Sequence, residues 1–192
     1  MKELLIINGH PDTKSYNYAL SEAYKSGAKT TEVRISEIHI ASLDFDPNLA
    51  FGYRKRMELE PDLLKALELI KKADHIVWFF PMWWYGYPAI MKGFIDRLFL
   101  PGIAFESIEG KVQHKKLFKG KTARIVITAD TPRWYDYLFM KRPAINQFKK
   151  GTLEFCGIRP VAVSYIAPVK NSSHEFRTKQ LDKMSLLGKR LK

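Results

Sequence analysis

An unusual concentration of aromatic side chains occupies residues 80–89, which read FPMWWYGYPA. The segment follows an apolar run that is typical of a buried strand, and it leads into a helical pattern. Loops are normally polar, so this many large apolar side chains in one loop need a partner. A flat aromatic ligand that packs against rings and accepts backbone hydrogen bonds would be such a partner. The alternative is a loop that covers the core or forms an interface.

Residues 8–17, NGHPDTKSYN, form a second candidate site between the first apolar run and the first helical pattern. Free backbone N–H groups and the positive end of a helix dipole favour an anion at such a place. Ser15 and Asn17 would add side-chain donors, and His10 and Lys14 would add positive charge. The spacing matches neither the GxxxxGK(S/T) loop nor the GxGxxG fingerprint. An ordinary capped helix start is therefore the alternative.

A third segment, residues 128–137 (TADTPRWYDY), follows another strand-like run and is again rich in aromatic residues. Tyr135 or Tyr137 could donate a proton or a hydrogen bond, and Arg133 could hold a phosphate through its bidentate fork. Aromatic packing within a loop is the alternative. The sequence contains no GxSxG, HExxH or EF-hand pattern, so neither a serine nucleophile nor a metal site is expected. Chemistry without such groups is typical of a cofactor.

The three segments all lie where a strand-like run ends. Strands are predicted at residues 4–7, 30–35, 75–80, 123–128 and 161–166, and helices at 15–26, 61–73, 88–100, 141–156 and 176–191. This alternation predicts an α/β fold whose parallel sheet is wound on both faces. Ligands bind such sheets at the carboxyl ends of the strands, where the three segments would meet. Residues 37–60 form a long excursion, and residues 111–121 form a basic connector.

Composition places the chain among globular proteins, with 46% hydrophobic and 27% charged residues in a length of 192. This length predicts a single domain over residues 1–192. Cys156 is the only cysteine, which excludes an internal disulfide and suits a cytoplasmic protein. No apolar run is long enough for a signal peptide or a membrane span.

Positive charge is concentrated in the second part of the chain. Residues 1–110 carry 13 Lys and Arg against 15 Asp and Glu, whereas residues 111–192 carry 19 against 5. Such a basic half can attract an anionic cofactor, anionic lipid or nucleic acid, or it can be simply a solvated surface. No zinc-finger spacing or aromatic RNA-binding pattern accompanies it, so a nucleic-acid partner is not expected.

Two longer segments resemble those of a known protein family. Residues 8–20 (NGHPDTKSYNYAL) and 80–99 (FPMWWYGYPAIMKGFIDRLF) resemble the flavodoxin-like NAD(P)H:quinone oxidoreductases, and the second matches their pattern FPxxW(F/Y)GxPAxxKG(F/W). That family includes mammalian quinone reductase, bacterial modulators of drug activity and the ancillary flavoproteins of potassium-efflux systems. The resemblance spans the chain. It implies a flavodoxin-like three-layer fold, a five-stranded parallel sheet in the order 2-1-3-4-5, and a homodimer.

The resemblance also assigns site residues. It implies that His10, Ser15, Tyr16 and Asn17 bind the phosphate and ribityl parts of a flavin, that Pro81, Met82, Trp83, Trp84 and Tyr85 lie against its isoalloxazine ring, and that Thr128 borders it. Tyr135 is the implied catalytic residue. Many relatives carry a Thr-Thr-Gly-Gly segment after the fourth strand, whereas this chain has no glycine there. FMN is favoured as the cofactor, with FAD as the alternative.

The implied activity is two-electron reduction of a quinone or similar flat electrophile by NAD(P)H, in a ping-pong sequence. The basic half predicts that NADPH is used at least as well as NADH, with Arg133 as the first candidate for its phosphate. Two alternatives stay open. The protein could be a regulatory flavoprotein that associates peripherally with a membrane cation-efflux transporter, or an electron carrier similar to flavodoxin.

Overall fold

The computed structural model of the chain describes residues 1–110 and 112–191. Lys111, the first residue of the predicted basic connector, and Lys192, the last residue of the predicted domain, lie outside the described residues. Among the described residues, no helix combines the length and the apolar character needed to cross a membrane.

Five parallel strands form the central sheet. They are β1 (Lys2–Asn8), β2 (Val33–His39), β3 (His75–Pro81), β6 (Thr122–Thr128) and β7 (Val161–Ile166), in the spatial order β2-β1-β3-β6-β7. Every residue of β3 is buried, as expected for a central parallel strand covered on both faces. Numbered within this sheet alone, the order is the predicted 2-1-3-4-5.

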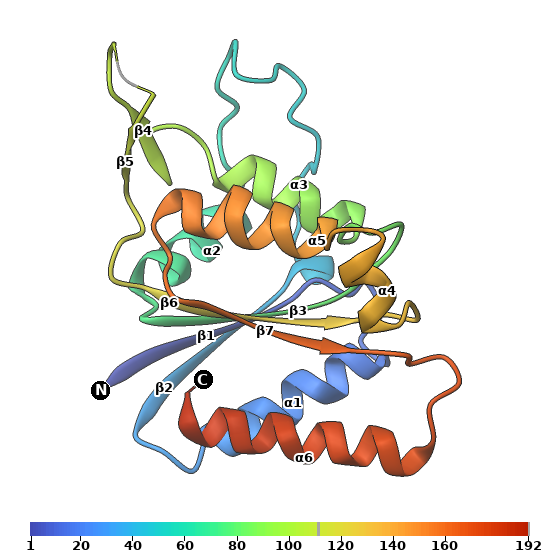
Figure 1. Ribbon diagram of the computed structural model, residues 1–192. Helices are drawn as coiled ribbons and strands as arrows, with labels where there is room; N and C mark the ends of the chain where they lie inside the picture. Colours follow the sequence, from blue (N-terminus) through green and yellow to red (C-terminus); the bar gives the residue numbers. More distant parts are fainter. Residues whose placement is uncertain (111, 192) are drawn as a thin grey trace.

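Helices cover both faces of the sheet, which gives three layers (Figure 1). On one face lie α1 (Tyr16–Ala28) and α6 (His174–Arg190); on the other lie α2 (Pro61–Lys72), α3 (Ala89–Leu98), α5 (Pro143–Ile145) and η2 (Asn146–Glu154). Trp78, Phe94 and Phe148 belong to the core on the α3 side, and Tyr24 and Phe79 to the core on the α1 side. The sheet therefore separates two apolar cores.

Glycines allow α1 and α6 to approach each other closely. A Cβ atom on Gly27 would lie 1.9 Å from the carbonyl oxygen of Ser185, and one on Gly188 would lie 2.0 Å from that of Tyr24. Any other residue at either position would force the two helices apart. The position of α1, and hence of its first turn, is thus fixed by contact with α6.

The second strand begins later than predicted, at Val33 instead of residue 30. Thr30 and Thr31 have the β-branched side chains that favour a strand. Their hydroxyls instead donate to the carbonyls of Gly27 and Ala28, which completes the end of α1. The prediction of a strand over residues 30–35 was therefore wrong at both ends, because β2 spans Val33–His39.

The region after β6 also differs from its prediction. Residues expected to form a loop make the short helix α4 (Arg133–Leu138). The helix predicted over residues 141–156 begins only at Pro143, because Lys141 and Arg142 have positive φ angles of 58° and 57°. It then continues as the π-helix η2 rather than as a regular α-helix.

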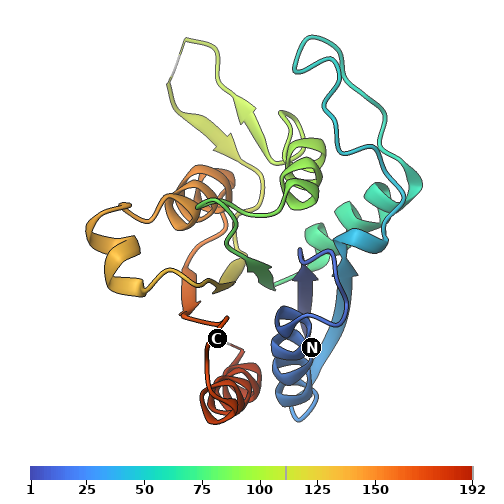
Figure 2. The same ribbon diagram turned by 90° about the vertical axis from the view of Figure 1, so that its right-hand side faces the viewer.

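A small antiparallel hairpin was missed by the sequence patterns. It joins β4 (Phe105–Ser107) to β5 (His114–Lys116), and β5 lies within the predicted basic connector. Three-residue strands with mostly polar side chains carry no usable alternation, so the pattern could not identify them. Residues 43–60, here called the long loop, and this hairpin both extend away from the sheet on the α3 side (Figures 1 and 2).

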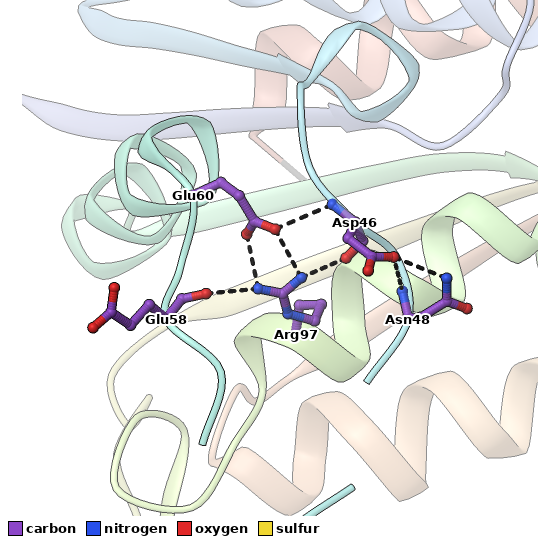
Figure 3. A network of polar contacts seen from close by, with 5 residues as sticks. All are labelled: Asp46, Asn48, Glu58, Glu60 and Arg97. Carbon is purple, nitrogen blue, oxygen red and sulfur yellow. Dashed lines mark hydrogen bonds and ion pairs between the residues drawn. The ribbon is translucent and has the colours of Figure 1, made fainter. Parts of the chain in front are cut away.

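One buried arginine holds both ends of the long loop (Figure 3). Arg97 on α3 is fully buried and donates to the carbonyl oxygens of Asp46 and Glu58. Its guanidinium also forms two bonds to the Glu60 carboxylate, of 3.0 and 2.8 Å. The Glu60 carboxylate in turn accepts from the Asp46 amide at 3.1 Å. The loop is therefore fastened at its two ends, while the residues between them extend outward.

A buried histidine makes stability depend on pH. His75 in β3 contacts the hydroxyl of Thr122, and burial, with the nearby charges of Arg124 and Lys2, lowers its pKa from 6.5 to about 4. The folded chain therefore binds fewer protons than the unfolded chain between these values. The contribution of His75 to the free energy of unfolding is therefore fully retained at neutral pH and is lost as the pH drops below about 6.5.

We expect the free energy of unfolding to fall by about 2 kcal/mol between pH 7 and pH 5 from this group alone. Urea denaturation at several pH values would measure it. The variant His75→Asn keeps a polar group but does not titrate, so its pH dependence should be smaller. Replacing the exposed His174 with Asn serves as the control, and equal slopes in all three proteins would contradict the assignment.

Candidate functional site

The carboxyl ends of β1, β3, β6 and β7 meet at one edge of the sheet, which faces the viewer in Figure 2. A pocket of about 270 Å³ lies there. Its lining consists of His10, Tyr16, Asn17, Pro81, Met82, Trp83, Thr128, Ala129, Asp130, Val169 and Lys170. The three segments singled out in the sequence therefore come together. Of the predicted cofactor-binding residues, Ser15, Trp84 and Tyr85 do not line this pocket.

The loop after β1 is held in shape by its own side chains. The buried Asn8 accepts a bond from the His10 amide at 3.0 Å and donates to Ser21 at 3.1 Å. His10 Nδ1 accepts from the Asp12 amide at 2.9 Å, and Asp12 accepts from the Lys14 amide at 2.9 Å. The shape of the loop is thus fixed by bonds within the protein itself.

His10 does not supply the positive charge that was predicted for it. Burial lowers the pKa of the imidazole, and the bond from the Asp12 amide requires an unprotonated Nδ1. A neutral ring of this tautomer carries its proton on Nε2 and offers a neutral donor. The ring also meets Trp83 edge-on, with centroids 5.7 Å apart. His10 therefore links the first loop to the aromatic loop.

The first turn of α1 supplies the donors of this site. Ser15 is the N-cap: its hydroxyl accepts from the Tyr18 amide, and its own amide donates to Asp12. Ser15 is therefore engaged in starting the helix. The amides of Tyr16 and Asn17 follow it, and N–H groups of a first helical turn have no acceptor within the helix. These are the free backbone donors that an anion site at this helix start would need.

Asn17 connects the first loop to β6. It is 2% exposed, and its Nδ2 donates to Thr128 Oγ1 at 2.7 Å. Its Oδ1 is buried and has no hydrogen-bond partner among the described residues. A buried polar atom without a partner is costly, and a ligand hydroxyl would satisfy it. The ribityl chain of a flavin carries such hydroxyls, so the residues present fit this group.

The aromatic loop contains a strained turn. Trp83 and Gly86 exchange two backbone hydrogen bonds of 3.0 and 2.9 Å, and the two residues between them, Trp84 and Tyr85, have φ angles of 49° and 58°. This is the geometry of a type I′ turn, which normally takes Asn and Gly. A bulky residue in this region costs about 1–2 kcal/mol. Such strain is concentrated at ligand-binding segments.

Some backbone donors of the aromatic loop are already engaged within the protein. The Met82 amide donates to Thr128 at 2.7 Å, and the Trp83 amide donates to Gly86. In the part of the chain that the structure describes, the backbone amides of Trp84 and Tyr85 donate to no backbone carbonyl. The amides of Trp84 and Tyr85 are therefore the candidate backbone donors of this turn to a flat ligand.

The turn allows a test of stability against binding. Trp84 is completely exposed, so Trp84→Asn removes no core packing and places a residue that tolerates positive φ. We expect the free energy of unfolding to rise by about 0.5–1 kcal/mol, and flavin affinity to stay nearly unchanged, because the Trp84 side chain does not line the pocket and its backbone amide is kept. Denaturation and flavin titration measure the two quantities. Tyr53→Asn, on the long loop, is the control; a Trp84→Asn protein that gains no stability would argue against strain.

The segment after β6 closes the pocket without glycine. Asp130 accepts from the amides of Val169 and Lys170, at 3.3 and 2.7 Å, and so holds the loop after β7 as the far wall. Val169 and Lys170 were not predicted as site residues. No local pattern marks them, since they are brought to the site by bonds to Ala129 and Asp130, which are distant in sequence. Tyr135, the predicted catalytic residue, lies outside the pocket on α4, stacked on Phe139 at 5.1 Å.

Comparison with known proteins agrees with this architecture. A family model described as a flavodoxin-like fold matches residues 2–186. The chain belongs to this flavodoxin-like family. Among curated members, NAD(P)H dehydrogenase (quinone) 1 of Cavia porcellus is 27% identical over 94% of this chain and 74% of its own. Ribosyldihydronicotinamide dehydrogenase (quinone) of Mus musculus is 28% identical over 92% and 86%.

Solved structures superimpose over nearly the whole chain. Smu.1420 from Streptococcus mutans UA159 has a TM-score of 0.87 and 30% identity, over 98% of this chain and 99% of its own. The NAD(P)H:quinone oxidoreductase from Methanothermobacter marburgensis has a TM-score of 0.83 at 20% identity, over 100% and 99%, and shows a shared fold. The predicted family is therefore confirmed.

Proposed function

We propose that the protein is an FMN-dependent NAD(P)H:quinone oxidoreductase. The observation that carries the proposal is the pocket at the sheet edge, where helix donors, the unpartnered Asn17 Oδ1 and a strained aromatic turn lie side by side. The names of the curated relatives support quinone as the acceptor. An FMN-dependent NADH-azoreductase from Bacillus anthracis, 18% identical with a TM-score of 0.80, supports the fold as one that can hold FMN.

In this proposal the protein binds and orients while the cofactor carries the electrons. When bound, the flavin supplies two-electron exchange between a nicotinamide and a quinone. The amides of Tyr16 and Asn17 hold its phosphate, and Asn17 Oδ1 holds a ribityl hydroxyl. Pro81, Met82 and Trp83 border the ring, and the Trp84 and Tyr85 amides donate to it. Tyr135 is the proposed proton donor, since α4 stands at the same edge of the sheet (Figure 2).

Nicotinamide and quinone would use the same open side of the pocket in turn, which predicts ping-pong kinetics. The central test is the visible spectrum of the purified protein, followed by reconstitution with FMN or FAD and by NAD(P)H oxidation with a benzoquinone. A colourless protein that binds neither flavin would refute the proposal. Flavin without quinone turnover would instead favour the electron carrier or the regulatory subunit of a cation-efflux system. A single flavin-binding domain in the cytoplasm remains part of the proposal, in keeping with the buried, unpaired Cys156.

We also expect a homodimer in which the second copy closes the active site. Trp83 and Trp84 beside the pocket, and Phe139 just after α4, expose large apolar side chains. Exposed apolar patches of this kind mark interaction surfaces. Sedimentation velocity across a range of concentrations measures the assembly. A monomer that is fully active at nanomolar concentration would count against the dimer.

A further inference from the structure

A second pocket lies beside the proposed flavin site. It is open, has a volume of about 630 Å³, and is lined by Pro132, Arg133, Trp134, Tyr137, Arg142, Ala167 and Pro168. The loops after β6 and β7 border both pockets: Asp130 and Val169 face the first, while Pro132 and Pro168 face the second. A ligand that crosses these two loops would therefore reach from one pocket into the other.

The second pocket combines positive charge with aromatic surface. The Arg142 guanidinium lies 5.3 Å from the centre of the Tyr137 ring, and Trp134 is 60% exposed. Within residues 1–110 and 112–191, the side chains of Arg133 and Arg142 form no hydrogen bond and no ion pair, and Arg142 Nε is buried without a partner. The nearby Asp136 carboxyl interacts electrostatically with Arg142, whereas Arg133 is exposed on α4. Two guanidinium groups with free hydrogen-bond donors beside aromatic rings favour a flat, anionic ligand.

The backbone holds Arg142 in an uncommon conformation. Lys141 and Arg142 both have positive φ, and the Arg142 amide donates to the Asp136 carbonyl at 3.0 Å. Non-glycine residues keep such angles only where the surrounding structure enforces them, often at ligand-binding segments. This bend starts the α5 segment and sets Arg142 at the rim of the pocket rather than in regular helix.

We propose that this pocket binds the adenosine 2′-phosphate end of NADPH, with adenine against Trp134 and Tyr137 and the phosphate between Arg133 and Arg142. The proposal rests on the proposed function, because it places the nicotinamide end at the neighbouring flavin pocket. Guanidinium groups bind phosphate in a bidentate manner. NADH lacks the 2′-phosphate, so the pocket discriminates between the two nucleotides.

Binding is tested without turnover, by calorimetric titration of the purified full-length protein with 2′,5′-ADP and with 5′-AMP. We expect 2′,5′-ADP to bind at least tenfold more tightly than 5′-AMP. Arg133→Gln and Arg142→Gln should each weaken 2′,5′-ADP about ten- to a hundredfold and leave 5′-AMP nearly unchanged. Arg190→Gln, which removes the same charge from the exposed end of α6, should change neither. Arg133 is exposed on α4, so we expect Arg133→Gln to fold. This variant alone tests the phosphate site even if Arg142→Gln does not fold.

Steady-state kinetics give an independent reading. The KM for NADPH should rise in Arg133→Gln while the KM for NADH and both kcat values stay the same. Equal affinity for the two adenosine phosphates, no binding of either, or a 2′,5′-ADP affinity that survives both substitutions would overturn the proposal. A protein that binds 2′,5′-ADP as expected but oxidises neither nucleotide would retain the pocket and refute only the proposed function.

Discussion

Replacing Arg97 with methionine is expected to lower the free energy of unfolding by about 3 kcal/mol. Removing one partner of a buried ion pair typically costs about 3–5 kcal/mol, and the lower end applies because the Glu60 side chain is 29% exposed. The loss also leaves the carbonyls of Asp46 and Glu58 without their donor. Urea denaturation measures the effect.

The same change should release the long loop. Arg54, Lys55 and Arg56 lie exposed between its fastened ends, and each is a trypsin cleavage position. We expect faster cleavage there in Arg97→Met than in the unaltered protein. Lys92→Met is the matched control, since Lys92 lies on the same helix in a surface pair with Asp96, and such pairs contribute about 1 kcal/mol or less. Equal cleavage rates in the two variants would show that Arg97 does not fasten the loop.

Asn17→Ala is expected to weaken flavin binding about ten- to a hundredfold. The change removes the unpartnered Oδ1 and the bond to Thr128, so both the ligand contact and the link from α1 to β6 are lost. A buried hydrogen-bonding group that loses its partner costs about 1–3 kcal/mol, and each ~1.4 kcal/mol is tenfold in affinity. Titration of the apoprotein with FMN, followed by flavin fluorescence, measures the dissociation constant.

Asn48→Ala makes the same chemical change on the exposed long loop and should leave flavin affinity unaltered. Thr128→Val separates the two contributions of Asn17, because it breaks the link to β6 and keeps Oδ1 in place. We expect it to have an intermediate effect. Flavin affinity that is unchanged in Asn17→Ala would refute the placement of the ribityl chain.

The central strands could be predicted because their burial leaves a clear mark in the sequence. β1, β3 and β6 are covered on both faces, so they read as short, nearly continuous apolar runs. β2 lies at the edge of the sheet and is mostly half-buried, which leaves little contrast between its residues and Thr30 or Thr31. The π-helix η2 is defined by hydrogen bonds between residues five apart, and no residue type is specific for that spacing.

The part of the site that lies directly after the sheet strands could be predicted from the sequence. His10, Asn17 and Met82 follow strands that could be recognised, so their convergence followed from the topology. Lys170 could not be found, because the Asp130 carboxylate that holds it is 40 residues away in sequence. The neutral state of His10 was equally hidden, since it depends on the bond from Asp12 and on burial.

The contact between α1 and α6 has a consequence for engineering. Replacing a helical glycine with alanine is a common route to thermostability, because it restricts the unfolded chain. At Gly27 and Gly188 the added methyl group would collide with the backbone of the opposite helix. The first turn of α1 carries the backbone donors of the site. Alanine at Gly27 or Gly188 would shift α1 and these donors with it, so both positions should be left out of a stabilising design. Gly151, where a Cβ would meet only the Asn146 carbonyl at 3.9 Å, is the helical glycine open to such redesign.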